Sequence, residues 1–232
     1  MTISLELLKR NRYFAQVPPT EIEAISRHIF EKAASREEII ILEGEPADAL
    51  YFVVSGAVKI LKTSADGKEQ ILEIVLPGAS FNDVAALVSG LNHASAQAMG
   101  PVVLYGLPGR HLELILKEHP QVTRNVIRVL SDQILHLTSL VEDLSFRTVI
   151  SRTAKILLDY ATADVTTERP LTQREMAAIA GTVREVIGRS LKHMEDRGVI
   201  SIERHRIIIT NRLALKIMAG ITDETEVTDN PL

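Results

Sequence analysis

The stretch "TQREMAAIAGTVREVIGRSLK", Thr172 to Lys192, contains two similar four-residue phrases ten positions apart. Thr-Gln-Arg-Glu begins at Thr172 and Thr-Val-Arg-Glu begins at Thr182. Each has the form of a capping box, in which a threonine hydroxyl and a glutamate carboxylate accept from free N–H groups at a helix start. Gly181 lies between the phrases. The pattern predicts two short helices joined by a tight turn, one from about Gln173 to Ala180 and one beginning after Thr182.

Two helices joined by a glycine-containing turn are the ingredients of a helix-turn-helix. The apolar residues that the two helices would bury are Met176, Ile179, Val186, Ile187 and Leu191. The opposite face of the second helix carries Arg184, Glu185, Arg189 and Lys192, with Gly188 leaving room for close approach to DNA. In this motif the N-terminal part of the second helix enters the major groove. The alternative is a solvated face with local ion pairs.

The segment "GVISIERHRIIIT", residues 198–210, has the pattern of a strand, a basic turn and a second strand. A hairpin directly after a recognition helix makes a winged helix, whose basic tip would lie against phosphates. The residues that we expect at DNA phosphates are Thr172, Thr182, Val183, Lys192, Arg204 and Arg206.

Charge is distributed unevenly along the 232 residues, whose net charge is -4. Residues 1–146 hold 13 Lys and Arg against 18 Asp and Glu, whereas residues 147–220 hold 13 against 8. Such asymmetry suggests a nucleic-acid or membrane partner for the basic part, although ordinary surface variation would give the same numbers. The sequence has no bilayer-spanning apolar run and no signal-peptide core, which predicts a cytoplasmic protein with no membrane partner.

Short strands dominate the first half of the chain. Residues 37–81 are rich in Ile, Val, Leu, Tyr and Phe and are broken repeatedly by glycine. "ADGK" (Ala65–Lys68) places an Asp-Gly pair between two apolar runs, a strong hairpin signal. "PVVLYGLP" (Pro101–Pro108) is another strand candidate, and residues 20–30 have the pattern of a short amphipathic helix. The pattern predicts a sandwich or jelly-roll barrel.

A long helix is predicted from Pro120, because no proline or glycine follows before Pro170. Within it, spacings of three and four alternate along a seam made of Ile127, Leu130, Ile134, Leu137, Val141 and Leu144. β-Branched residues at one seam position and leucine at the other favour a two-stranded coiled coil. Packing on the chain's own barrel would also need an apolar stripe. Because Val126 and Leu135 lie off the seam, we expect the helix to pack on the barrel and to form a homodimer.

Together these segments resemble the CRP/FNR superfamily of bacterial transcription regulators over nearly the whole chain. "EGEPADALYFVVSGAVKI" and "DGKEQILEIVLPG" resemble the glycine-punctuated strands of the cyclic-nucleotide-binding domain. "HPQVTRNVIRVLSDQILHL" is similar to the dimerisation helix, and "LTQREMAAIAGTVREVIGRSLKHMEDRGVI" is similar to the DNA-binding motif.

The resemblance implies an α+β fold in four parts. These are a β jelly-roll sensor domain (1–118), a dimerisation helix (119–146), a winged helix-turn-helix (147–220) and an acidic tail (221–232) that we expect to be disordered. It further implies that Arg184 and Arg189 each contact a guanine and Glu185 a cytosine, within a TGTGA-like half-site. The implied protein is a homodimeric, allosteric regulator that binds double-stranded DNA at an inverted repeat and has RNA polymerase as a partner.

The sequence departs from the family at the effector site. Members that bind cyclic AMP carry a Gly-Glu pair for the ribose and an Arg-Ser pair for the phosphate, where this chain has Asn82-Asp83 and Asn92-His93. The pair for the adenine falls on Leu137-Thr138. No lysine or arginine occurs from Glu69 to Gly109. Because a desolvated phosphodiester needs charge partners or several hydrogen bonds, we do not expect cyclic AMP as the effector.

Other effectors stay open at this point. An iron–sulfur cluster is excluded because the chain has no cysteine. Haem would need an axial ligand such as His93, Met99 or His136, although a lone histidine is more often an ordinary surface residue. A small apolar or weakly polar ligand would suit the cassette better than an anion, and a barrel that binds nothing is equally compatible with the sequence.

An enzyme is the first rival to a DNA-binding function. None of the familiar catalytic motifs occurs, and the seven histidines show no metal-ligand spacing, so we expect no enzyme and no metal site. A cyclic-nucleotide-binding module acting on a protein partner is the second rival. Both the missing arginine and the Arg-Glu…Gly-Arg helix argue against it.

Overall fold

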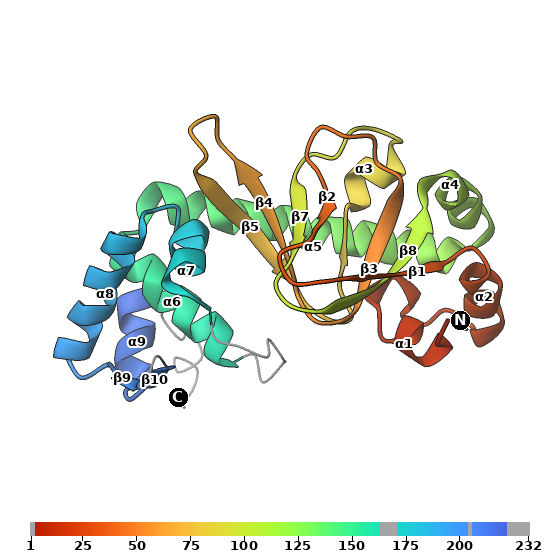
Figure 1. The fold of residues 1–232 in the computed structure, drawn as a ribbon. Helices are drawn as coiled ribbons and strands as arrows, with labels where there is room; N and C mark the ends of the chain where they lie inside the picture. Colours follow the sequence, from red (N-terminus) through yellow and green to blue (C-terminus); the bar gives the residue numbers. More distant parts are fainter. Residues whose placement is uncertain (1–2, 163–170, 204–205, 222–232) are drawn as a thin grey trace, which may run out of the picture. The chain divides into compact units, whose positions relative to one another are not determined.

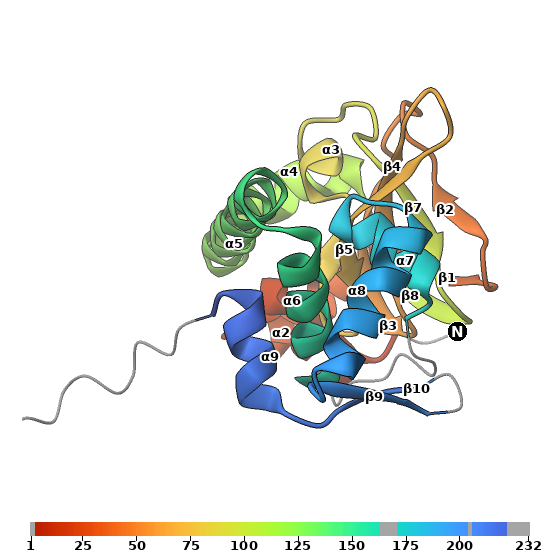
Figure 2. The same ribbon diagram turned by 90° about the vertical axis from the view of Figure 1, so that its left-hand side faces the viewer.

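The computed structural model describes residues 3–162, 171–203 and 206–221. The chain divides into two compact units between Leu140 and Val141 (Figures 1 and 2). Arg204 at the expected wing tip and the acidic tail from residue 222 lie outside the described residues.

Two four-stranded antiparallel sheets form the body of the first unit. One has the order β1 (Phe30–Ala34), β8 (Val102–Pro108), β3 (Ala49–Ser55) and β6 (Ser80–Phe81). The other has the order β2 (Ile39–Ile41), β7 (Ser95–Ala98), β4 (Val58–Thr63) and β5 (Glu69–Val75). The non-sequential strand order of both sheets confirms the predicted jelly-roll. The Asp-Gly hairpin is also confirmed, since β4 pairs with β5 and Gly67 has φ +80° at the turn.

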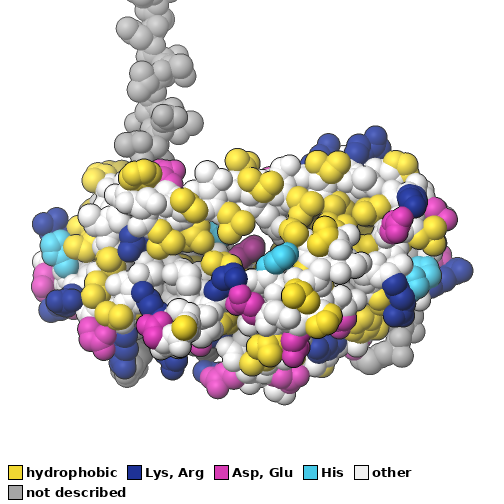
Figure 3. All heavy atoms as spheres, turned by 90° about the horizontal axis from the view of Figure 1, so that it is seen from above, with side chains coloured by type: hydrophobic (Ala, Val, Ile, Leu, Met, Phe, Trp, Pro, Cys, Tyr) yellow, Lys and Arg dark blue, Asp and Glu magenta, His cyan; other side chains and the backbone are white. Residues whose placement is uncertain are grey.

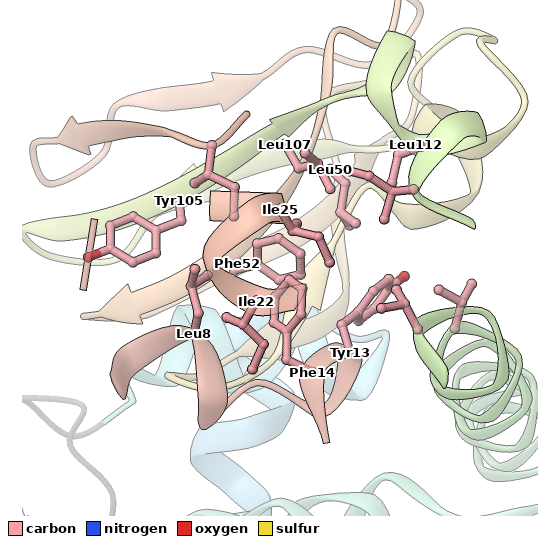
Figure 4. Packing of buried hydrophobic residues seen from close by; sticks show 14 of the residues in the cluster. Leu8, Tyr13, Phe14, Ile22, Ile25, Leu50, Phe52, Tyr105, Leu107 and Leu112 are labelled. Carbon is pink, nitrogen blue, oxygen red and sulfur yellow. The ribbon is translucent and has the colours of Figure 1, made fainter. Parts of the chain in front are cut away.

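Helices cover the outer face of the first sheet. They are α1 (Leu5–Lys9), the 3-10 helix η1 (Arg12–Phe14), α2 (Pro19–Ser26), α4 (Gly109–Glu118) and the start of α5 (Pro120–Phe146), while α3 (Asp83–Leu87) follows β6. Figure 4 shows their apolar side chains meeting those of β3 and β8. Leu50 and Phe52 of β3 and Leu107 of β8 are almost completely buried there. A second cluster, which includes Tyr51, Val58 and Leu104, contains side chains of both sheets.

One face of α5 packs on the barrel and another is open. Val122, Val126 and Val129 are buried in the same apolar cluster as Leu50 and Phe52 of β3. The expectation that Leu135 also packs on the barrel is wrong, because its side chain is 67% exposed. The stripe of three valines, at spacings of four and three, faces the sheet instead and turns Leu135 away from it.

The second unit is a winged helix-turn-helix, as predicted. Its elements are α6 (Val149–Thr162), α7 (Gln173–Ala180), α8 (Arg184–Asp196), β9 (Ile200–Glu203), β10 (Arg206–Ile209) and α9 (Arg212–Ala219). β9 and β10 pair as an antiparallel hairpin. Ile187, Leu191 and Met194 of α8 are buried against α6 and α9 in one apolar cluster.

The turn between α7 and α8 bears out one of the two predicted capping boxes. Thr172 Oγ1 accepts from the Glu175 N–H at 3.2 Å, and the Thr172 N–H donates to Glu175 Oε2 at 2.7 Å. Gly181 ends α7 in the left-handed conformation, with φ +64°. The second predicted box is wrong. The Thr182 N–H closes α7 by donating to the Ala177 carbonyl at 2.9 Å, so α8 begins after Val183 without a side-chain cap.

Candidate DNA-reading surface and effector cavity

The first two turns of α8 carry three charged side chains that are exposed and unpaired within the described structure. Arg184, Glu185 and Arg189 are exposed, and within the described ranges none of them makes a side-chain hydrogen bond or ion pair. The buried Ile187 and Leu191 fix the rotation of the helix and thereby hold these three on the outer side. Local ion pairs are therefore absent at these three described residues, whereas Lys192, further along the same face, does form them.

Gly188 lies on the same outer face as the three charged residues. Its φ is not positive, and a Cβ built there would meet only Gln173 Oε1, at 3.8 Å, which is ordinary contact. Glycine inside a helix costs about 1 kcal/mol relative to alanine. Packing within the described structure does not require this glycine, whereas close approach of another molecule to the helix would.

The other residues expected at DNA differ in exposure and in whether they have a partner within the protein. Val183 and Arg206 are exposed, and Thr182 is half-buried. Thr172 is exposed, but its hydroxyl is part of the capping box. Lys192 Nζ pairs with Asp196 at 3.0 Å and with Glu195 at 3.2 Å. Hydrogen bonds to these carboxylates, Asp196 first, raise the pKa of Lys192.

A charged network at the start of the second unit was missed by sequence reasoning. Asp143, near the end of α5, is buried and pairs with Arg147 at 2.7 Å and with Lys155 at 2.5 Å. Arg152 Nε donates to the Ala180 carbonyl at 2.8 Å, and its Nη1 donates to the Arg147 carbonyl at 2.7 Å. The network therefore fastens the C-terminal end of α5 to α6 and to the end of α7. The i,i+4 spacing of Asp143 and Arg147 was its only visible signal.

A cavity of about 300 Å³ lies in the first unit among β4, β5, α3, the segment before β7 and α5. Of the six residues expected at an effector, four line it: Asn82, Asp83, His93 and Leu137. Asn92 and Thr138 do not. Asn92 Nδ2 donates to the Leu42 carbonyl at 3.1 Å, and Thr138 Oγ1 donates to the Ile134 carbonyl at 2.9 Å.

Asp83, which the resemblance places at the family's ribose-binding glutamate, is hydrogen-bonded within its own protein. It is 3% exposed and accepts from the Tyr13 hydroxyl, from Ser80 Oγ at 2.8 Å and from Gln133 Nε2 at 3.1 Å. Burial, together with the nearby Asp83 carboxylate, raises the pKa of Tyr13, so the phenol keeps its proton and donates it. Asp83 thus ties η1, β6 and α5 together.

Glu73, on β5, was not expected at the cavity but lines it. Among the described residues its carboxylate has no hydrogen-bond partner. Burial raises the pKa of Glu73, the His136 ring opposes this shift, and the Asp83 charge adds to it. No lysine or arginine is among the residues that line this cavity. An adjoining cavity of about 240 Å³ shares Glu73, Gln133 and His136, and the arginine there, Arg12, pairs with Asp132.

The residues considered for haem are divided. His93 and His136 line the cavity, whereas Met99 is buried elsewhere. In the described part of the chain, no group of three or more His, Asp or Glu residues is arranged to hold a metal ion. Among the described helices, none combines the length and apolar character needed to cross a membrane.

Comparisons with known proteins agree with both halves of this description. Residues 31–119 match the cyclic nucleotide-binding domain, and residues 151–218 match the Crp-like helix-turn-helix domain. The chain is 30% identical to the CRP-like cAMP-activated global transcriptional regulator of Mycobacterium tuberculosis over 213 residues, 89% of this chain and 95% of the relative. It is 30% identical over 190 residues to the global nitrogen regulator of Synechocystis sp., 78% of this chain and 84% of that protein.

Solved structures give the same result. FixK2 from Bradyrhizobium japonicum superimposes with a TM-score of 0.73 at 26% identity, covering 82% of this chain and 96% of that one. The catabolite activator protein of Thermus thermophilus gives a TM-score of 0.54 at 25% identity, covering 91% and 100%.

Proposed function

The chain belongs to the CRP/FNR family of DNA-binding transcription regulators, and from that premise we propose that it acts as a homodimer reading an inverted repeat with TGTGA-like half-sites. The observation that carries the proposal is the outer face of α8. There, Arg184, Glu185 and Arg189 are exposed without internal partners. Because its target is DNA, we place the protein in the cytoplasm, with RNA polymerase as a partner.

The side chains on α8 suit base reading at the proposed half-site. Arginine can make two hydrogen bonds to guanine O6 and N7, and glutamate can accept from cytosine N4. Arg184 and Arg189 therefore each read a guanine and Glu185 reads a cytosine. The glycine at position 188 lets the helix lie close to the base edges between them. Arg206 and, outside the described residues, Arg204 contact phosphates from the wing.

The exposed face of α5 supports the homodimer. Hydrophobic side chains reach the surface in several places on the face shown in Figure 3. On α5, the exposed fractions are 60% for Ile127, 64% for Ile134 and 63% for Val141. Leu130 departs from the predicted seam, because it is partly buried against the core of its own barrel. A helix with large apolar side chains in heptad register exposes them at a cost unless a partner covers them. Reading both half-sites of an inverted repeat requires two recognition helices about 34 Å apart, one turn of DNA, and a homodimer supplies two such helices.

We further propose that the effector of this regulator is not cyclic AMP. The lining of the cavity supports this, because Glu73 and Asp83 are acidic and no lysine or arginine lines it to pair with a cyclic phosphodiester. Some relatives are named for activation by cyclic AMP and others for nitrogen regulation, so the shared fold serves more than one signal.

The experiment is fluorescence anisotropy of a labelled TGTGA-type palindrome against the purified protein, with and without cyclic AMP. A scrambled duplex of the same composition is the control, and all titrations use one salt concentration. We expect tight binding to the palindrome alone, unchanged by the nucleotide. Equal affinity for both duplexes would contradict the DNA-reading proposal. A strong rise in affinity with cyclic AMP would contradict the exclusion of that effector, and palindrome binding with no response to any small molecule would indicate an effector-independent regulator.

A further inference from the structure

The cavity in the first unit offers acceptors where a phosphate would need donors. Asn82 Nδ2 donates to the Ala49 carbonyl at 3.0 Å, and Gln133 Nε2 donates to Asp83 at 3.1 Å. Both acceptors are oxygens, which fixes the orientation of each amide. The Asn82 and Gln133 side-chain carbonyls have no hydrogen bond within the described structure, so both keep acceptor capacity.

The charge of the cavity also favours a cationic ligand over an anionic one. Its ionisable lining consists of the carboxylates of Glu73 and Asp83 and the rings of His93 and His136. Asp83 accepts three hydrogen bonds from the protein, whereas Glu73 accepts none from the residues described. Apart from the electrostatic effect of the nearby His136 ring, the half-buried Glu73 carboxylate is therefore open to a hydrogen-bond donor, and a bound cation would supply one.

The rest of the wall is apolar. Eight of the lining residues are hydrophobic: Ile60, Leu72, Phe81, Val84, Ala85, Ala94, Ala96 and Leu137. With a volume of about 300 Å³, the cavity is at the small end of ligand sites in proteins. It therefore has room for a compact apolar body together with one polar head.

We infer that this cavity binds a small organic amine, with its ammonium group at Glu73 and its apolar body against the hydrophobic wall. The inference rests on the proposed function, because it makes this cavity the effector site of the regulator. The carbonyl oxygens of Asn82 and Gln133 supply further acceptors for the three N–H groups of a primary ammonium.

Such a ligand would contact α5 directly. Gln133, His136 and Leu137 all line the cavity, and the same helix carries the exposed seam proposed for the dimer. Gln133 is already held by Asp83. An ammonium group that attracts the Gln133 carbonyl would reinforce one arrangement of this helix, and an effector acts by favouring one of two conformations in this way.

The test uses matched probes that differ only in the head group. Phenyl, indole and hexyl bodies are each supplied as the amine, the alcohol and the carboxylate, for example tryptamine, tryptophol and indole-3-acetate. Binding to the full chain is measured by ligand-observed NMR and calorimetry for the wild type, for Glu73→Gln and for Glu113→Gln. Glu113 is an exposed carboxylate on α4 that pairs with Lys117, away from the cavity, so its variant is the matched control.

We expect at least one amine to bind the wild type and the control about 10-fold more tightly than its carboxylate, and Glu73→Gln to abolish that preference. The inference is overturned if the carboxylates bind as well as the amines, if none of the nine probes binds, or if Glu73→Gln keeps the preference. The wild-type comparison needs no variant, so it decides even if Glu73→Gln folds poorly. Probe binding is measured without DNA, so it does not depend on the palindrome titration. A failed titration would contradict the DNA-reading proposal without affecting the probe result.

Discussion

The outer face of α8 and the cavity beside α5 match the same family, yet the structure treats them differently. On α8, Arg184 and Arg189 are exposed and have no partner among the described residues. At the cavity, the resemblance aligns Asp83 with the family's ribose-binding residue, but its carboxylate accepts hydrogen bonds from Tyr13, Ser80 and Gln133. We therefore propose the family's role only for side chains at shared positions that have no partner within the described structure, as on α8. We do not propose it for Asp83, whose carboxylate is hydrogen-bonded within its own protein.

The largest expected effect concerns the homodimer, on which the proposed reading of an inverted repeat by two α8 helices depends. Ile134→Lys places a charge on the seam of α5 at a residue that is 64% exposed and does not line the cavity. We expect a monomer in sedimentation, since two ammonium groups would face each other across the interface. Affinity for the palindrome should fall about 100-fold or more, because the second half-site is no longer bound by a linked domain.

Leu114→Lys is the matched control for the seam. Leu114 is 51% exposed on α4 of the same unit, so the same change of charge and size occurs outside α5. It should leave sedimentation and DNA binding unchanged. A dimeric Ile134→Lys protein would place the interface elsewhere.

The second effect tests base reading on α8. Arg189→Ala should lose about 1–3 kcal/mol of specific binding, concentrated at one base pair, because an arginine–guanine contact is removed. Lys192→Ala is the comparison, since its ammonium pairs with Glu195 and Asp196 and is assigned to phosphate. It should weaken all duplexes alike and reduce the salt dependence. If Arg189→Ala bound the palindrome and each of its single-base variants with the affinity of the wild type, α8 would not be the helix that reads the bases.

Much of the fold could be predicted because its signals are local. The Asp66-Gly67 pair gave the β4–β5 hairpin, and Thr172 with Glu175 gave the start of α7. A residue whose neighbours act within one helical turn carries its structural meaning in the sequence itself. The exposure of the outer face of α8 followed from the same kind of periodicity.

The cavity could not be predicted, since its contacts join residues far apart in sequence. Tyr13 reaches Asp83 across 70 positions, and Gln133 reaches it across 50. Similarly, Thr182 looked like a helix cap, but its N–H serves the preceding helix instead. No local pattern marks which of several polar groups the tertiary structure will use.

The smallest expected effect is a pH dependence that isolates Glu73. Burial raises the pKa of Glu73 above its ordinary value of 4.5, so the folded state holds this proton more tightly than the unfolded state does. The contribution of Glu73 to stability is therefore fully present below pH 4.5 and is lost as the pH rises through the raised value. Glu73→Gln cannot ionise, so its stability relative to the wild type should increase over that window and then level off.

The measurement is chemical unfolding of both proteins from pH 4 upward, taken as a difference. His136 on α5, Asp83 at the start of α3 and His93 before β7 face the same cavity and are present in both proteins, so the difference isolates the change at position 73. An added amine that binds at Glu73 should shrink the difference at high pH, because it supplies the missing partner to the ionised carboxylate in the wild type only. A difference that does not change with pH would mean that Glu73 is solvated in the folded protein, and the cavity would then lose the feature that distinguishes it from the open face of α8.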